Sequence, residues 1–257
     1  MKLHYRQFGE EHSGIPLLLL HGLLGSLVNW QRVARRLAEH HRVIVPDLRN
    51  HGRSPHHPDV SYPAMAGDVL ELLDDLGVDE AVPVGHSMGG KVAMWLALTL
   101  PHRVERLVVA DIAPVRYQGG LGELMDAMLE LPLDEIDKRT EADALLARRV
   151  PDAAVRAYLL QNLVHTERGW RWRSNLRALR DGLDLISGFP EVPPEAHYGG
   201  PVLFIHGGSS DYVKPEYLPV MERLFPNLEL VTLDAGHWVY AEQPESFVSV
   251  VEDFVDR

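Results

Sequence analysis

The sequence contains no cysteine, which excludes disulfide bonds, thiolate metal sites and a cysteine nucleophile. It also has no excess of positive charge, because 25 Lys and Arg residues stand against 37 Asp and Glu, for a formal net charge of −12. A surface of that charge repels a phosphate backbone, so we do not expect nucleic acid as a partner. Hydrophobic residues make up 46% of the chain, which is enough to build a sizeable core.

Long hydrophobic runs are also missing. The most apolar stretch, IPLLLLHGLLGSLV at residues 15–28, is short and contains His21 and two glycines, whereas a membrane-spanning helix needs about 20 mostly apolar residues. Polar residues interrupt the opening segment MKLHYRQFGEEHSG, so it does not have the apolar core of a signal peptide. We therefore expect a soluble cytoplasmic protein that does not act at a membrane.

Short apolar runs alternate along the chain with longer segments of helical period. Strands buried on both faces are predicted at residues 17–20, 42–47, 81–85, 106–111, 201–207 and 228–233. Helices with one apolar face are predicted at residues 30–39, 62–76, 90–100, 216–225 and 246–255. This alternation indicates an α/β fold with a mostly parallel central sheet and helices on both of its faces.

The alternation is interrupted between residues 113 and 200, where the sequence predicts no strand. Helical segments are predicted instead, at residues 121–131, 141–149, 152–163 and 174–185. We expect residues 1–112 and 201–257 to form one core domain, with residues 113–200 inserted as a helical lid, or cap. The insertion would lie near the C-terminal ends of the strands, where α/β sheets bind ligands. A helical bundle that only stabilises the core is the alternative.

The segment GHSMGGKV at residues 85–92 fits two motifs with different chemistry. Read as G-x-x-x-x-G-K, it matches most of a phosphate-binding loop. That loop needs Ser or Thr after the Lys to bind Mg²⁺, however, and the next residue is Val92. Read as G-x-S-x-G, it matches a nucleophile elbow, in which a sharp strand-to-helix turn exposes a serine. The predicted strand before the segment and the predicted helix after it favour the elbow, with Ser87 as the nucleophile.

A serine nucleophile needs a base, an acid and oxyanion donors, and the chain has candidates for each at the ends of predicted strands. The N–H groups of Met88, after the serine, and Leu23, in HGLLGS, are placed to receive an oxyanion. His237, in LDAGHWVYAEQP, is the candidate base. Asp111 and Asp211 both lie between the serine and the histidine, and either is a candidate acid.

The segments HGLLGS, VIVPDLRNHGRSP, VGHSMGGKVAM, VVADIAPV and GHWVYAEQP resemble those of α/β-hydrolases, and of YbfF-type esterases in particular. The resemblance extends over essentially the whole chain. It implies a serine hydrolase that cleaves small carboxylic esters of short to medium acyl length through an acyl-enzyme, without a metal or cofactor. It favours Asp211 as the acid, because this residue has the usual position after the strand that follows the insertion. Asp111 is the alternative, since the acid of this subgroup can come from the earlier strand.

Other activities fit the same serine, histidine and acid. An acyl thioesterase, a C–C bond hydrolase and a perhydrolase remain alternatives, as does a non-catalytic ligand-binding receptor on this fold. We expect the insertion to set the acyl-length preference, through Trp170 and the predicted helix at 121–131. We call HGLLGS, residues 21–26, the oxyanion loop. We expect His21 to hold this loop in place by hydrogen bonding, and we expect the polar residues of 47–54 to connect loops to one another.

Overall fold

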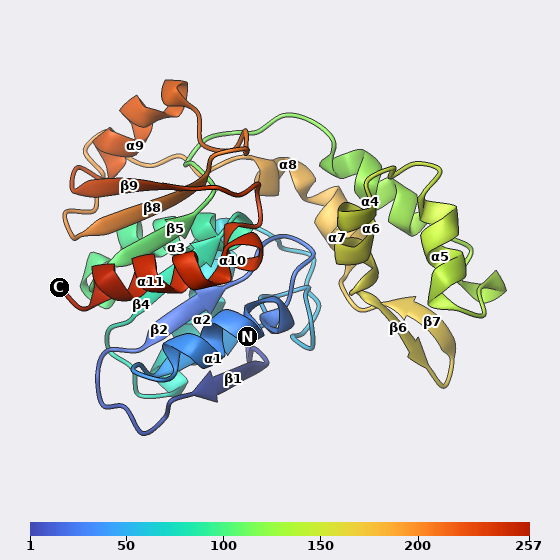
Figure 1. Cartoon of the computed structure of the whole chain (residues 1–257), viewed down its shortest axis with the longest axis horizontal. Helices are drawn as coiled ribbons and strands as arrows, with labels where there is room; N and C mark the ends of the chain where they lie inside the picture. Colours follow the sequence, from blue (N-terminus) through green and yellow to red (C-terminus); the bar gives the residue numbers. More distant parts are fainter.

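The central sheet has seven strands in a computed structural model that describes all 257 residues (Figure 1). Its strands are β1 Tyr5–Phe8, β2 Leu17–Leu20, β3 Val43–Pro46, β4 Val82–His86, β5 Leu107–Ala110, β8 Val202–Gly207 and β9 Leu228–Leu233. They lie in the order β1-β3-β2-β4-β5-β8-β9. Only the edge pair β1–β3 is antiparallel. The predicted mostly parallel sheet is confirmed.

Helices cover both faces of this sheet. They are α1 Gln31–Leu37, α2 Tyr62–Asp75, α3 Met88–Thr99, α9 Leu218–Leu224, α10 Val239–Glu242 and α11 Pro244–Val255. In Figure 1, α1, α10 and α11 lie in front of the sheet, and α2 and α3 lie behind it. Alternate residues of the buried strands point to opposite faces, so Leu18 and Leu20 join the core under α2 and α3, and Leu17 and Leu19 join the core under α1 and α11. None of the helices is long and apolar enough to cross a membrane.

The insertion between β5 and β8 contains strands as well as helices, and it projects to one side of the core (Figure 1). Its helices are α4 Leu121–Leu129, α5 Arg139–Leu146, α6 Ala153–Leu160, α7 Leu176–Asp181 and α8 Leu183–Ser187. Strands β6 Leu163–Thr166 and β7 Gly169–Trp172 form an antiparallel hairpin. The expectation of no strand in this segment is therefore wrong. Each strand is short and mostly half-exposed, so neither produces the continuous apolar run of a buried strand.

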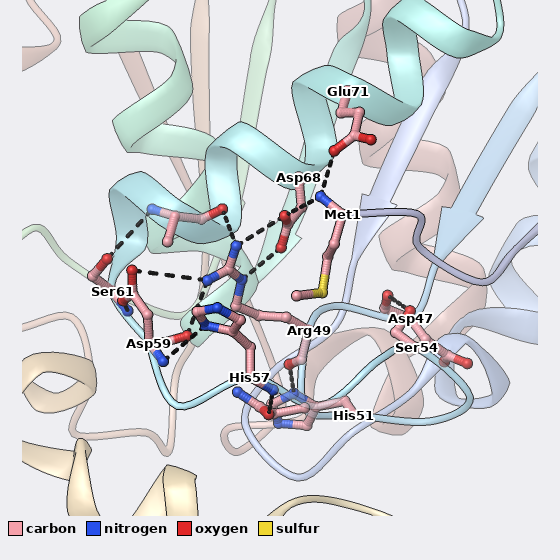
Figure 2. A network of polar contacts seen from close by, with 12 residues as sticks. Met1, Asp47, Arg49, His51, Ser54, His57, Asp59, Ser61, Asp68 and Glu71 are labelled. Atoms are coloured by element: carbon pink, nitrogen blue, oxygen red, sulfur yellow. Dashed lines mark hydrogen bonds and ion pairs between the residues drawn. The ribbon is translucent and has the colours of Figure 1, made fainter.

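A buried ion pair fixes the loop between β3 and α2 (Figure 2). Arg49 donates from Nε to Oδ2 of Asp68 at 2.5 Å and from Nη2 to Oδ1 at 2.8 Å. Its other contacts are the backbone carbonyls of Asp59 and Ala64, each at 3.0 Å, and the carboxylate of Asp59, 3.9 Å from Nη1. The amino group of Met1 also donates to Asp68, at 2.7 Å. Because Asp68 belongs to α2, the pair attaches the loop to the core.

Asp68→Asn is expected to lower the free energy of unfolding by about 3–5 kcal/mol, because it leaves the buried guanidinium of Arg49 with only the exposed carboxylate of Asp59, at 3.9 Å. Urea unfolding of the variant and of the wild type measures the loss. Asp74→Asn is the matched control, because its carboxylate pairs with Arg103 at the surface and such pairs contribute about 0–1 kcal/mol. Equal losses in the two variants would contradict the account of the loop.

Candidate active site

Ser87 stands at the turn between β4 and α3, in a strained backbone conformation. Its φ is 52° and its ψ is −118°, a combination that costs a non-glycine residue on the order of 1–3 kcal/mol. A Cβ on Gly85 would lie 2.3 Å from the carbonyl oxygen of Gly89, and a Cβ on Gly89 would lie 2.3 Å from that of Leu20. The N–H of Ser87 donates to the carbonyl of Ala110 on the next strand at 3.0 Å. The turn therefore has the strand–turn–helix geometry of a nucleophile elbow.

His237 lies on the loop after β9, and its Nδ1 donates to Oδ2 of Asp111 at 2.7 Å. The carboxylate also accepts from the N–H of Gly207 at 2.9 Å and from the hydroxyl of Ser210. Burial alone would raise the pKa of Asp111, but the hydrogen bonds from His237, Ser210 and Gly207 hold this pKa below its usual value. Since Nδ1 carries the proton, Nε2 of the neutral imidazole is free to accept one.

The structure corrects the preference for Asp211 as the carboxylate beside His237. Asp211 is exposed, whereas Asp111 is fully buried and makes the hydrogen bond to the imidazole. The turn after β8 is closed by the N–H of Ser210, which donates to the carbonyl of Gly207 at 2.8 Å. That turn presents the hydroxyl of Ser210, and not the carboxylate of Asp211, to the buried site.

Tyr212 is a further neighbour of the imidazole that the sequence did not indicate. Its ring stacks on the ring of His237, with 3.9 Å between centroids and an interplanar angle of 20°. The carbonyl of Tyr212 accepts from the hydroxyl of Tyr117, at the start of the insertion. The insertion is thereby connected to the loop that packs against the imidazole.

The oxyanion loop follows β2 and packs against the elbow. A Cβ on Gly22 would lie 3.0 Å from Nδ1 of His86, which is a tight contact, and 3.4 Å from Cβ of Ser87, so glycine gives the loop its close approach to the elbow. Leu23 and Met88 both line the cavity that contains Ser87, and neither N–H donates to another backbone group. Both donors named from the sequence are therefore free to bind an oxyanion at this place.

Two buried histidines hold the oxyanion loop in place by hydrogen bonds to backbone groups. His21 accepts at Nε2 from the N–H of Leu48, at 3.0 Å, and donates from Nδ1 to a carbonyl of its own loop. His51 accepts at Nε2 from the N–H of Leu24, at 3.1 Å, and donates from Nδ1 to the carbonyl of Arg49. Burial lowers the pKa of His21 to about 4 and that of His51 to about 3. Both rings are thus neutral braces and not bases, as expected of His21.

Acid should destabilise the protein through these histidines. Their folded pKa values lie below the unfolded value of 6.5, so their contribution to stability is complete above about pH 6.5 and is lost as pH falls toward 4. Each is expected to lower the free energy of unfolding by about 1.4 kcal/mol per pH unit in that window. Urea unfolding at several pH values in this range gives the slope of the free energy of unfolding against pH. Relative to the wild type, this slope should be shallower in His51→Gln and unchanged in His102→Gln, because His102 is exposed. Identical slopes in all three proteins would contradict the neutral state of His51.

A mostly apolar cavity of about 270 Å³ opens above Ser87 and His237. Of its 20 lining residues, 14 are hydrophobic. The insertion supplies part of the wall from α4, α6 and α8, through Leu121, Leu124, Val155, Tyr158, Leu159, Ile186 and Ser187. The structure thus places the predicted helix at 121–131 against the site. It does not place Trp170 there, because this side chain lies in the hairpin and packs on His165 at 5.0 Å between ring centroids.

Comparison with known proteins agrees with this fold. Residues 15–244 match the family model for the alpha/beta hydrolase fold. The chain is 43% identical to the sn-1-specific diacylglycerol lipase ABHD11 of Mus musculus, over 99% of this chain and 85% of that protein. It is 36% identical to Esterase YbfF of Escherichia coli, over 100% of both chains. The solved structure of a marine microorganism esterase is similar with a TM-score of 0.94 and 35% identity, over 98% of this chain and 99% of the other. The chain belongs to the α/β-hydrolase family.

Proposed function

We propose that the chain hydrolyses small carboxylic esters of short to medium acyl length, in two steps, through an acyl-enzyme on Ser87. Its family and its relatives named esterase and lipase make it a carboxylic ester hydrolase. The observation that supports the two-step mechanism is the hydrogen bond of 2.7 Å between the buried Asp111 and His237, which lines the cavity that also contains Ser87. We also propose that the protein acts in the cytoplasm and binds no nucleic acid, in keeping with its net charge of −12.

In the first step, the hydroxyl oxygen of Ser87 attacks the ester carbonyl while Nε2 of His237 takes its proton. The N–H groups of Leu23 and Met88 bind the oxyanion of the tetrahedral intermediate, each contributing about 3 kcal/mol to the transition state. Asp111 stabilises the imidazolium and keeps its Nδ1 protonated. The imidazolium then passes the proton to the alkoxide, which leaves as the alcohol.

In the second step, water replaces the alcohol. Nε2 of His237 takes a proton from the water as it attacks the acyl carbonyl, and the same two N–H groups bind the second oxyanion. Collapse of the intermediate returns the proton from His237 to Ser87 and releases the carboxylic acid. The chain's own residues supply every proton transfer in this cycle.

We propose that residues 113–200 act as a lid and that residues 1–112 and 201–257 form the catalytic core. The support is the position of α4, α6 and α8 in the wall of the cavity. Apolar side chains such as Leu121 and Leu124 suit an acyl chain, because they contribute hydrophobic contact without a polar group that needs a partner. A bundle that only stabilises the core would not need to line the site.

Leu124→Trp is expected to lower kcat/KM for an octanoate ester about 10-fold relative to an acetate ester, because the larger ring fills space that the longer acyl chain uses. The measurement compares p-nitrophenyl esters of increasing acyl length. Trp170→Phe is the control and should leave the ratio unchanged, since Trp170 does not line the cavity. A ratio that stays at the wild-type value in Leu124→Trp, with an ordinary melting temperature, would contradict the lid. A matched thioester, a C–C bond substrate, and the same esters with hydrogen peroxide as the acyl acceptor test the competing activities.

A further inference from the structure

The hydrogen bond that His237 donates to Asp111 and the stack on Tyr212 orient the imidazole, but neither fixes the backbone that carries the ring. His237 belongs to an irregular loop between β9 and α10, and no strand ladder holds its peptide groups. A catalytic side chain has to be held to within roughly 0.5 Å of its productive position. The contacts of residues 236–238 therefore decide how well the base is placed.

One carboxylate binds the N–H groups of the residues on both sides of the histidine. Glu242, at the end of α10, accepts from the N–H of Gly236 through Oε2 at 2.8 Å and from the N–H of Trp238 through Oε1 at 3.2 Å. Its side chain folds back over the loop so closely that a Cβ on Gly236 would lie 3.1 Å from Oε1. Glu242 is exposed and does not line the ester cavity, so it does not contact the acyl group.

A second side chain holds the carbonyl of the histidine, which belongs to the same peptide group as the N–H of Trp238. His86 precedes the nucleophile, is 1% exposed, and lies 2.8 Å through Nε2 from the carbonyl oxygen of His237. Because a carbonyl only accepts, Nε2 carries the proton and donates. The opposite nitrogen, Nδ1, has no hydrogen-bond partner, which agrees with an uncharged ring. Burial lowers the pKa of His86 to about 3, so this donor keeps the same protonation state at any pH where the base is active.

From these contacts we infer that Glu242 and His86 are positioning residues for the proposed base, and together hold the backbone of His237 from two sides. Glu242 binds the N–H groups of the flanking residues, and His86 binds the intervening carbonyl. His86 is adjacent to Ser87 and packs against Gly22 of the oxyanion loop, since a Cβ on Gly22 would lie 3.0 Å from its Nδ1. The contact to His237 therefore also ties the loop of the base to the elbow and to the oxyanion loop. This inference rests on the proposed function.

The test measures kcat and KM for p-nitrophenyl acetate in Glu242→Gln, Glu242→Ala and the control Glu245→Gln. Glutamine offers one carbonyl oxygen in place of two acceptors, and alanine offers none. We expect kcat to fall about 10-fold and about 100-fold, in that order, with KM within about twofold of wild type. Glu245→Gln should match the wild type, because it removes an exposed carboxylate that binds Arg32 and not the loop. Unchanged kcat in Glu242→Ala, or an equal loss in Glu245→Gln, would overturn the inference.

The His86 arm of the test uses rescue by a conservative side chain. His86→Gln keeps an N–H donor at the same reach and should retain most of the activity, whereas His86→Leu loses the donor and should lower kcat about 100-fold. Combined with Glu242→Ala, His86→Leu should cost less than the product of the two single losses, because both act on one loop. If the loss of kcat in the double variant equals the product of the two single losses, Glu242 and His86 do not act jointly on the loop. If His86→Leu does not fold, the Glu242 variants alone decide the inference. Should Ser87→Ala abolish activity while Glu242→Ala leaves kcat unchanged, only this inference fails. Should Ser87→Ala stay active, the proposed function fails.

Discussion

Ser87→Ala lowers kcat for ester hydrolysis by more than about 10³-fold, on the mechanism proposed above, and leaves the fold intact. The change removes the attacking oxygen, and only oxyanion binding and substrate binding remain to accelerate the reaction. Alanine is smaller than serine, and the close contacts at Gly85 and Gly89 that shape the turn are unchanged. Initial rates with a p-nitrophenyl butyrate substrate measure the loss, and circular dichroism and melting temperature report the fold.

Ser209→Ala is the matched control for the nucleophile. Ser209 is an exposed serine on the loop after β8, so its loss should leave the rate within about twofold of wild type. The expected loss leaves less than about a thousandth of the wild-type kcat. Ser87→Ala protein that keeps about a tenth or more of it, with a normal spectrum, would mean that another group is the nucleophile.

Asp111→Asn should lower kcat on the order of 10⁴-fold, because the amide favours the tautomer of His237 that lacks a proton on Nδ1. Asparagine has the size of aspartate, so the buried position stays filled. The same substitution at Asp211 should change kcat by less than about twofold, since this exposed residue makes no hydrogen bond to the imidazole. Rates of the two variants side by side, with melting temperatures, form the measurement. A severe loss in Asp211→Asn together with near-normal Asp111→Asn would reverse the assignment of the acid.

Most of the core fold could be predicted from the sequence, because parallel strands that are buried on both faces have continuous apolar sequences. LLLL at residues 17–20 is such a run, and every residue of β2 is buried. The same criterion misses β1, whose sequence YRQF is at most half-buried at the edge of the sheet, and it misses β6 and β7 for the same reason. Short, half-exposed strands are specified by their partners more than by their own residues.

The site could be predicted only as far as its parts lie next to a recognisable turn. The positions of Ser87, Met88 and Leu23 depend on the backbone conformation of turns next to glycines. The local sequence is therefore enough to predict their roles. The choice between Asp111 and Asp211 had no such signal, because both carboxylates follow predicted strands and only the course of the turn after β8 decides which is buried. Contacts between distant loops, such as the stack of Tyr212 on the imidazole, leave no trace in either segment alone.

The two-step mechanism requires above all that Ser87 is an activated nucleophile. Intact-mass measurement after treatment with a fluorophosphonate, followed by peptide mapping, tests it without any assumption about the natural ester. Addition of one phosphonyl group on the peptide that contains Ser87, absent in Ser87→Ala and much slower in Asp111→Asn, is the predicted result. Wild-type protein that stays unlabelled, or a phosphonyl group found on another residue, would contradict it.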